Sequence, residues 1–176
     1  MVSALTLFEL DEMMAAYASY EKLAEIIRHR FSKPKETLRE LFSRIVFNIL
    51  SGNTDDHARN HAAFWNGQQL SLTPAYDICP QSRSGQQASQ AMLIHDGDRS
   101  SHLATCIASV PSFLLAREEA IAIINHQVNV IEHEWPAICD EASLSEVDRA
   151  LFWRRQFLNP FAFLNAPQEV RIPLTG

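Results

Sequence analysis

The stretch that decides how this chain folds and works is Asn53-Thr-Asp55-Asp56-His57-Ala-Arg59-Asn60-His61. No other part of the 176-residue sequence gathers so many carboxylate, amide and imidazole groups. A further carboxylate, Asp77, lies downstream. Helical periodicity stops at Ser51-Gly52, a pattern typical of a helix C-cap, so we expect these polar residues to form a loop that follows a helix.

Residues 35–50, which precede this loop, carry a wide apolar face with helical spacing. This spacing predicts a helix that lies deep in the core. The residues of that face are Leu38, Leu41, Phe42, Ile45, Val46 and Ile49. A weaker apolar stripe predicts another helix over 6–29, divided near Ser19–Tyr20, and Ser32-Lys-Pro34 separates the two segments.

Downstream of the loop, Asn66-Gly67 joins two short segments of alternating polarity. Asn-Gly in this position is a strong signal for a β-hairpin, which we place over 62–73. Helical patterns return at 101–109, 116–138 and 144–157. We therefore predict a mainly α fold with one short β-hairpin, and a Ser/Gln/Gly-rich loop over 81–90.

Composition narrows the possible classes of protein. The chain has 47% hydrophobic residues and a net charge of −6, which fit a folded domain and argue against a broad nucleic-acid-binding face. No apolar run approaches the ~18 residues of a membrane span, and no signal peptide is visible, so we expect a cytoplasmic protein. The cysteines, Cys79, Cys106 and Cys139, form no C-x-x-C pair, and we expect buried thiols rather than a zinc site.

The polar residues have the order and spacing of a phosphotransferase site. Asp55 is followed five residues later by Asn60, and Asp77 comes just beyond the hairpin. In such sites one Asp accepts the proton of the attacking hydroxyl, while an Asn and a second Asp hold Mg²⁺ against the phosphates. Mg²⁺ prefers hard oxygen ligands, which carboxylate and amide groups supply.

Two neighbouring residues have open roles. Arg59 lies next to Asn60 and would place a cation near phosphate charge, or else form a surface ion pair with a carboxylate. His57 lies two residues after Asp55, where it would contact phosphate or support the loop.

Two blocks of the sequence resemble the HipA family of serine/threonine kinases, which are toxins of bacterial toxin–antitoxin systems. The blocks are Gly52-Asn-Thr-Asp-Asp-His-Ala-Arg-Asn-His-Ala-Ala-Phe-Trp65 and Leu72-Thr-Pro-Ala-Tyr-Asp-Ile78. The resemblance implies a helical kinase C-lobe, with Asp55 as catalytic base and with Asn60 and Asp77 as Mg²⁺ ligands. It also implies ATP as cofactor, a protein Ser or Thr as substrate, and a HipB-like antitoxin as partner.

The sequence departs from that family in what it lacks. Full-length members carry an N-terminal lobe with a phosphate-binding loop and a lysine on a β-strand. Here the lysines are Lys22, Lys33 and Lys35, all in predicted helical or linker segments. We therefore expect residues 1–176 to form one C-terminal lobe, inactive or weakly active unless an N-lobe is supplied, for instance by a split partner chain.

Three rival interpretations remain. His57 and His61 are four residues apart, as in zinc hydrolases, but they lack the neighbouring glutamate that such enzymes use as base. A second cluster of possible ligands, His95-Asp96-Gly97-Asp98 with His102, is typical of a solvated turn. Lastly, the chain would be a non-catalytic interaction or regulatory module if it never meets a phosphate-binding lobe.

Overall fold

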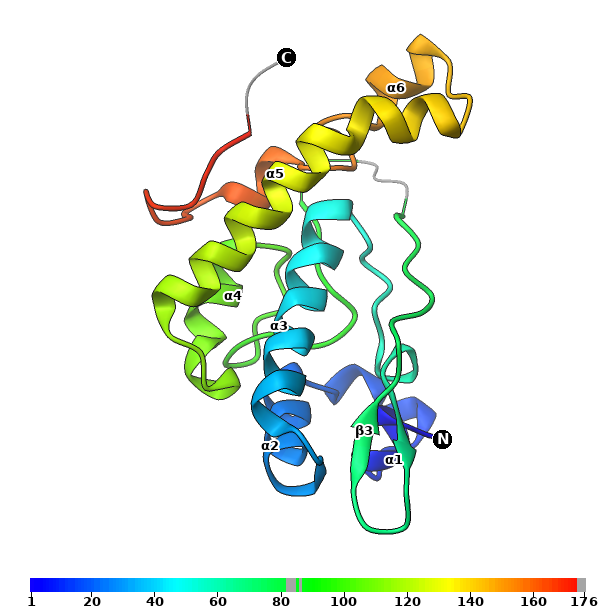
Figure 1. Cartoon of the computed structure of the whole chain (residues 1–176), viewed down its shortest axis with the longest axis vertical. Helices are drawn as coiled ribbons and strands as arrows, with labels where there is room; N and C mark the ends of the chain where they lie inside the picture. Colours follow the sequence, from blue (N-terminus) through cyan, green and yellow to red (C-terminus); the bar gives the residue numbers. More distant parts are fainter. Residues whose placement is uncertain (82–84, 86, 174–176) are drawn as a thin grey trace.

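The buried helix predicted before the polar loop is the central element of the fold. In the computed structural model, which describes residues 1–81, 85 and 87–173, this helix is α3, Pro34–Ser51. Pro34 occupies its first turn, where a missing N–H costs nothing. All six residues of its predicted apolar face are buried. Figure 1 shows α3 between α2 (Tyr20–Arg30) and α5 (Arg117–Glu141).

The rest of the chain is also mainly helical, as predicted. Two shorter α-helices and two 3₁₀ turns follow the hairpin: α4 (Leu103–Ser109), η3 (Val110–Phe113), α6 (Glu146–Phe152) and η4 (Pro160–Phe163). The long helix α5, expected over 116–138, contains Pro136 and runs on to Glu141.

The predicted hairpin is present and gains a third strand. Strands β2 (Ala62–Trp65) and β3 (Leu70–Leu72) pair antiparallel, with Ala63 opposite Leu72. The Asn66 side chain accepts hydrogen bonds from two backbone N–H groups inside the turn, which fixes the turn's shape. Strand β1 (Val2–Ser3) adds to the free side of β2. Sequence periodicity cannot reveal a two-residue strand, because only its long-range pairing defines it.

The helix predicted over 6–29 is wrong in its first half. The structure has a single helical turn α1 (Ala4–Leu7), a 3₁₀ segment η1 (Glu12–Tyr17), and only then α2. The side chain of Asp11 caps η1, and that of Ser19 caps α2. None of the residues of η1 is buried, so its apolar side chains contribute little to the core.

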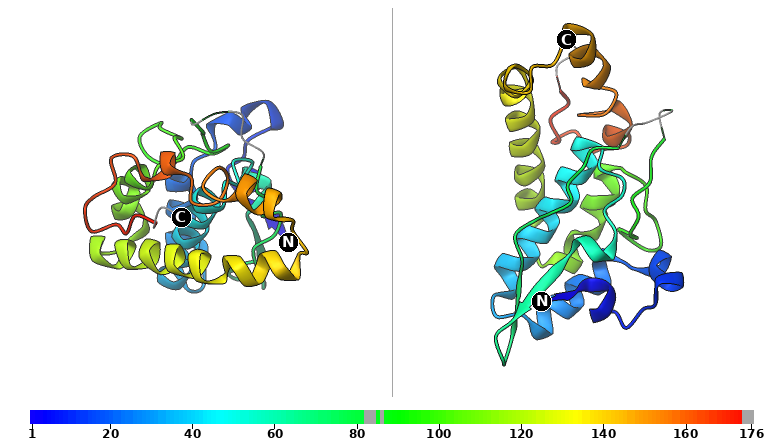
Figure 2. Two further views of the ribbon diagram at one scale, coloured as in Figure 1. Left: turned by 90° about the horizontal axis from the view of Figure 1, so that it is seen from above. Right: turned by 90° about the vertical axis from the view of Figure 1, so that its right-hand side faces the viewer.

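The arrangement of the elements positions the polar loop. Figure 1 and the right view of Figure 2 place the hairpin and the N-terminus at one end of the molecule and α6 at the other, with α3 running between them. The loop leaves α3 at the α6 end and descends toward β2. The segment after β3 then climbs back beside it (Figure 1).

Smaller expectations have mixed outcomes. Cys106 and Cys139 are buried free thiols as expected, but Cys79 is exposed. Of the loop expected over 81–90, residues 82–84 and 86 lie outside the described residues. Across the described part of the chain, no helix combines the length and apolarity needed to cross a membrane.

Candidate active site

The polar loop begins with a change of direction at Gly52. This residue ends α3 with a left-handed backbone, φ 76°, and its N–H and that of Asn53 bond back to carbonyls of the last helical turn. The Asn53 side chain donates to the Asn48 side-chain oxygen at 3.1 Å, and its own oxygen accepts from the Asp55 N–H at 3.3 Å. The helix end therefore sets the position of Asp55.

Asp56 is the buried anchor of the loop. Asp56 is 3% exposed, and its carboxylate accepts three side-chain hydrogen bonds on one oxygen, Oδ2. The donors are the Tyr20 hydroxyl from α2, the Asn48 amide at 2.7 Å from α3, and the His61 ring nitrogen Nε2 at 2.9 Å. One carboxylate thus joins two core helices to both ends of the loop.

The environment of Asp56 keeps it ionised. Burial acts to raise the pKa of Asp56, but hydrogen bonding and attraction from His61, with hydrogen bonds from Tyr20 and Asn48, hold the pKa below its usual value. Burial and the nearby Asp56 charge raise the pKa of Tyr20 well above its usual value, so Tyr20 remains a protonated donor.

Beside this anchor, one of the predicted site residues points outward and the other is buried. Asp55, one residue before the anchor, is exposed, whereas Asn60 is 5% exposed. The Asn60 amide nitrogen donates to the Asp55 backbone carbonyl at 3.3 Å, which ties the two predicted site residues together. That hydrogen bond uses the nitrogen and leaves the amide oxygen, a type of atom that Mg²⁺ accepts as a ligand, for other contacts.

The segment that carries Asp77 runs antiparallel to the loop. The Thr73 N–H donates to the Ala62 carbonyl at 2.9 Å, and the Gln81 N–H donates to the Gly52 carbonyl at 3.0 Å. Between these two contacts the Tyr76 hydroxyl donates to the Arg59 carbonyl. Asp77 therefore follows directly on a residue that contacts the loop, opposite the stretch from Asp55 to Asn60.

Further groups hold this second segment in place. Buried Arg44 of α3 donates to the Thr73 carbonyl at 2.8 Å and pairs with Glu40. Asp77 is exposed and has a left-handed backbone, φ 56°. Partial burial and the Asp77 charge raise the pKa of Tyr76, so its hydroxyl stays protonated and can donate to the Arg59 carbonyl.

Arg59 forms an ion pair with Glu12 of η1, so the surface-pair alternative describes its present contact. His57 braces the loop through its backbone: its N–H donates to the Asp55 carbonyl, and its carbonyl accepts from the Asn60 N–H, both at 2.9 Å.

The zinc-pair alternative is not favoured by the geometry. His57 and His61 flank the short turn η2 (Ala58–Asn60) instead of sharing a helix face. The Nε2 atom of His61 is bonded to Asp56. Within the described residues, neither histidine belongs to a group of three potential metal ligands.

The anchoring role of Asp56 is not evident from the sequence, where this residue is one of several in the polar run. The contributions of Tyr20 and Asn48 are not evident either. One signal was available: Asn48 lies among apolar residues near the end of a helix predicted to be buried. A buried amide needs hydrogen-bonding partners, and the nearest polar residues along the chain are those of the loop.

The chain resembles known proteins both in sequence and in fold. The model of the HipA-like C-terminal domain family matches residues 1–135. Among solved structures, the chain resembles HipA from a complex of Shewanella oneidensis MR-1 toxin–antitoxin proteins HipA and HipB with operator DNA. The TM-score is 0.69 at 19% sequence identity, over 86% of this chain but only 39% of that one. No curated protein matches the sequence significantly.

Proposed function

Because this chain belongs to the HipA-like C-terminal domain family, we propose that it is the metal-binding, catalytic-loop half of an ATP-dependent serine/threonine protein kinase. The observation that carries this proposal is the antiparallel contact between the loop 52–62 and the segment 73–81. The contact brings the segment that carries Asp77 beside the loop that carries Asp55 and Asn60, and these three residues follow one another in the order that phosphoryl transfer uses.

In the proposed mechanism the three residues divide the work. Asp55 orients the substrate hydroxyl and accepts its proton, because it is exposed and its backbone is fixed from both sides. The Asn60 amide oxygen and the Asp77 carboxylate hold Mg²⁺, for which hard oxygen donors are suitable ligands. Bound Mg²⁺ would neutralise charge on the ATP phosphates. Asp56 positions the loop without touching the reactants.

The same proposal includes a phosphate-binding lobe supplied by another part of a longer protein or by a separate chain. The three lysines lie in α2 or at the start of α3, so none is on a strand. The segment η1 exposes Met13 and Tyr17, 92% and 65% respectively, and is joined to the loop by the Glu12–Arg59 pair. Such an apolar surface beside the site suits a covering lobe. We expect little turnover without it.

A HipB-like antitoxin is the proposed protein partner. The similar HipA structure is a complex with HipB and operator DNA, which supports this choice. The acidic chain, with its net charge of −6, gives no reason to propose direct contact with nucleic acid.

The proposal predicts that Mg²⁺–ATP stabilises the chain through Asp77. A ligand at 100 times its dissociation constant stabilises by about 2.7 kcal/mol, which raises the unfolding midpoint of a chain this size by roughly 5–10 °C. We expect a saturable shift in a thermal-unfolding titration of the wild type, and loss of the shift in Asp77→Asn.

Asp96→Asn is the matched control for that titration. Asp96 is also exposed and also has a left-handed backbone, φ 44°, but lies outside the site. The control should shift like the wild type. An absent shift in the wild type, or equal shifts in both variants, would contradict nucleotide binding at Asp77.

One measurement distinguishes a non-catalytic regulatory role from the kinase role. Both permit ATP binding, but only the kinase role requires Asp55. Transfer of γ-phosphate to a protein Ser or Thr, assayed with a complementing N-lobe, must depend on Asp55 if the chain is catalytic. Binding without Asp55-dependent transfer would support the regulatory role.

A further inference from the structure

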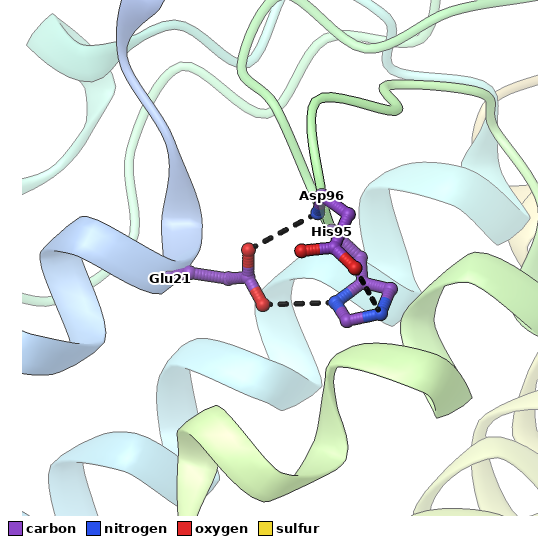
Figure 3. A group of neighbouring side chains, drawn as sticks. All are labelled: Glu21, His95 and Asp96. Atoms are coloured by element: carbon purple, nitrogen blue, oxygen red, sulfur yellow. Dashed lines mark hydrogen bonds and ion pairs between the residues drawn. The ribbon is translucent and has the colours of Figure 1, made fainter.

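A second polar cluster lies away from the proposed active site. Glu21 comes from the first turn of α2, and His95 and Asp96 come from a turn 74 residues later. One ligand atom from each of the three side chains lies within 4.8 Å of the others. Figure 3 shows the three groups converging, with one imidazole nitrogen facing the Glu21 carboxylate and the other facing that of Asp96.

Glu21 is held as an orienting group for the histidine. Its carboxylate accepts hydrogen bonds from His95 Nδ1 at 2.9 Å, the Asp96 N–H at 3.2 Å and the Ser112 hydroxyl at 3.1 Å. A carboxylate that accepts from Nδ1 places the imidazole proton there and leaves the Nε2 lone pair free to bind a metal.

The free nitrogen faces a second carboxylate at a distance suited to a metal. His95 Nε2 and Asp96 Oδ2 are 3.5 Å apart, longer than the ~2.7–3.2 Å of an ordinary N–H···O hydrogen bond. Two ligands of a tetrahedral zinc ion with bonds of about 2.0–2.1 Å lie roughly 3.3–3.4 Å apart. Imidazole with a carboxylate at its other nitrogen is the usual arrangement of a metal-binding histidine.

The backbone fixes this geometry. The turn closes through hydrogen bonds from the Ile94 N–H to the Asp98 carbonyl and from the Asp98 N–H to the His95 carbonyl, both 2.7 Å. The Asp96 side chain is 88% exposed, so water has access to complete the coordination of an ion.

We propose that His95 and Asp96 bind one divalent transition-metal ion such as Zn²⁺, with Glu21 orienting the imidazole. A nitrogen ligand favours Zn²⁺ over Mg²⁺, which prefers oxygen ligands only, so this site is chemically distinct from the proposed Asn60–Asp77 site. Its failure or success is therefore independent of the kinase proposal.

Calorimetric titration with ZnCl₂ alone, in a buffer that does not bind metal, tests the site. We expect saturable binding of one Zn²⁺ per wild-type chain. His95→Gln replaces the imidazole, and Asp96→Asn the carboxylate, by a neutral amide that is a poor ligand for Zn²⁺, so each should abolish binding. Glu21→Gln should weaken it by about 10–100-fold, the usual effect of losing the group that orients a metal-binding histidine.

The chain supplies a matched control in His133 and Glu134. These are also an adjacent histidine and acid 2.9 Å apart, but on the exposed surface of α5, and their side chains are 85% and 54% exposed. His133→Ala should bind Zn²⁺ like the wild type. Absence of binding in the wild type, unchanged binding in Asp96→Asn, or loss of binding in His133→Ala would each overturn the proposal. Circular dichroism of each variant separates loss of the site from loss of folding.

Discussion

Asp56→Ala should lower the free energy of unfolding by about 3–5 kcal/mol, the range seen when one partner of a buried, hydrogen-bonded charge network is removed. The substitution leaves the Tyr20 hydroxyl, the Asn48 amide and His61 Nε2 without their common acceptor, all in a region closed to water. Urea unfolding followed by circular dichroism measures the change.

Asp55→Ala is the control for that measurement. It also removes a carboxylate, but from the exposed residue that precedes Asp56, and should change the free energy of unfolding by no more than about 0.5 kcal/mol. Similar losses in the two variants would show that Asp56 is not the anchor. A loss of stability confined to Asp56→Ala would show that Asp56, and not its neighbour Asp55, stabilises the fold.

The pH dependence of the free energy of unfolding tests the role of Asp56 in a second way, which does not truncate the side chain to alanine. Its pKa is lower in the folded than in the unfolded state, so its contribution to stability is complete above the unfolded value, about 3.9, and is lost as pH falls through the folded value. The stability difference between wild type and Asp56→Asn should therefore be constant near neutral pH and shrink below about pH 4.

The sequence reveals those parts of the fold in which one segment carries its own signal. The apolar face of α3 has helical spacing along its whole length, and Asn66-Gly67 marks the hairpin turn. The stripe before Tyr20 has similar spacing but is misleading. Its residues Met13 and Tyr17 are exposed, so they contribute little to the core that such a stripe normally predicts.

The candidate site also contains residues that the sequence identifies and residues that it does not. Asp55, Asn60 and Asp77 could be selected because their order along the chain matches a known chemistry. Asp56 could not, because its role depends on Tyr20, which is 36 residues away on another helix. Spacing within the loop contains no information about that contact. The Glu21–His95 pairing was missed for the same reason, since it joins residues 74 apart.

Gly52→Ala should be the second most damaging change, with a loss of about 2–4 kcal/mol. Its left-handed backbone, φ 76°, costs an alanine about 1 kcal/mol, and overpacking adds about 1–3 kcal/mol. The overpacking arises because a Cβ at this position would lie 2.8 Å from the Gln156 backbone oxygen. That oxygen cannot easily move aside, because the Leu158 N–H nearby donates to the Leu50 carbonyl at 2.7 Å.

Gly97→Ala separates the two contributions. Gly97 has nearly the same backbone angle, φ 80°, but a Cβ there would meet nothing within 4 Å, so only the backbone cost of about 1 kcal/mol applies. Urea unfolding of both variants should show the larger loss in Gly52→Ala. Equal losses would mean that the chain near Gln156, which lies beyond the family match to residues 1–135, is not held against the loop. A larger loss in Gly52→Ala would show that this C-terminal segment packs closely against the start of the proposed catalytic loop.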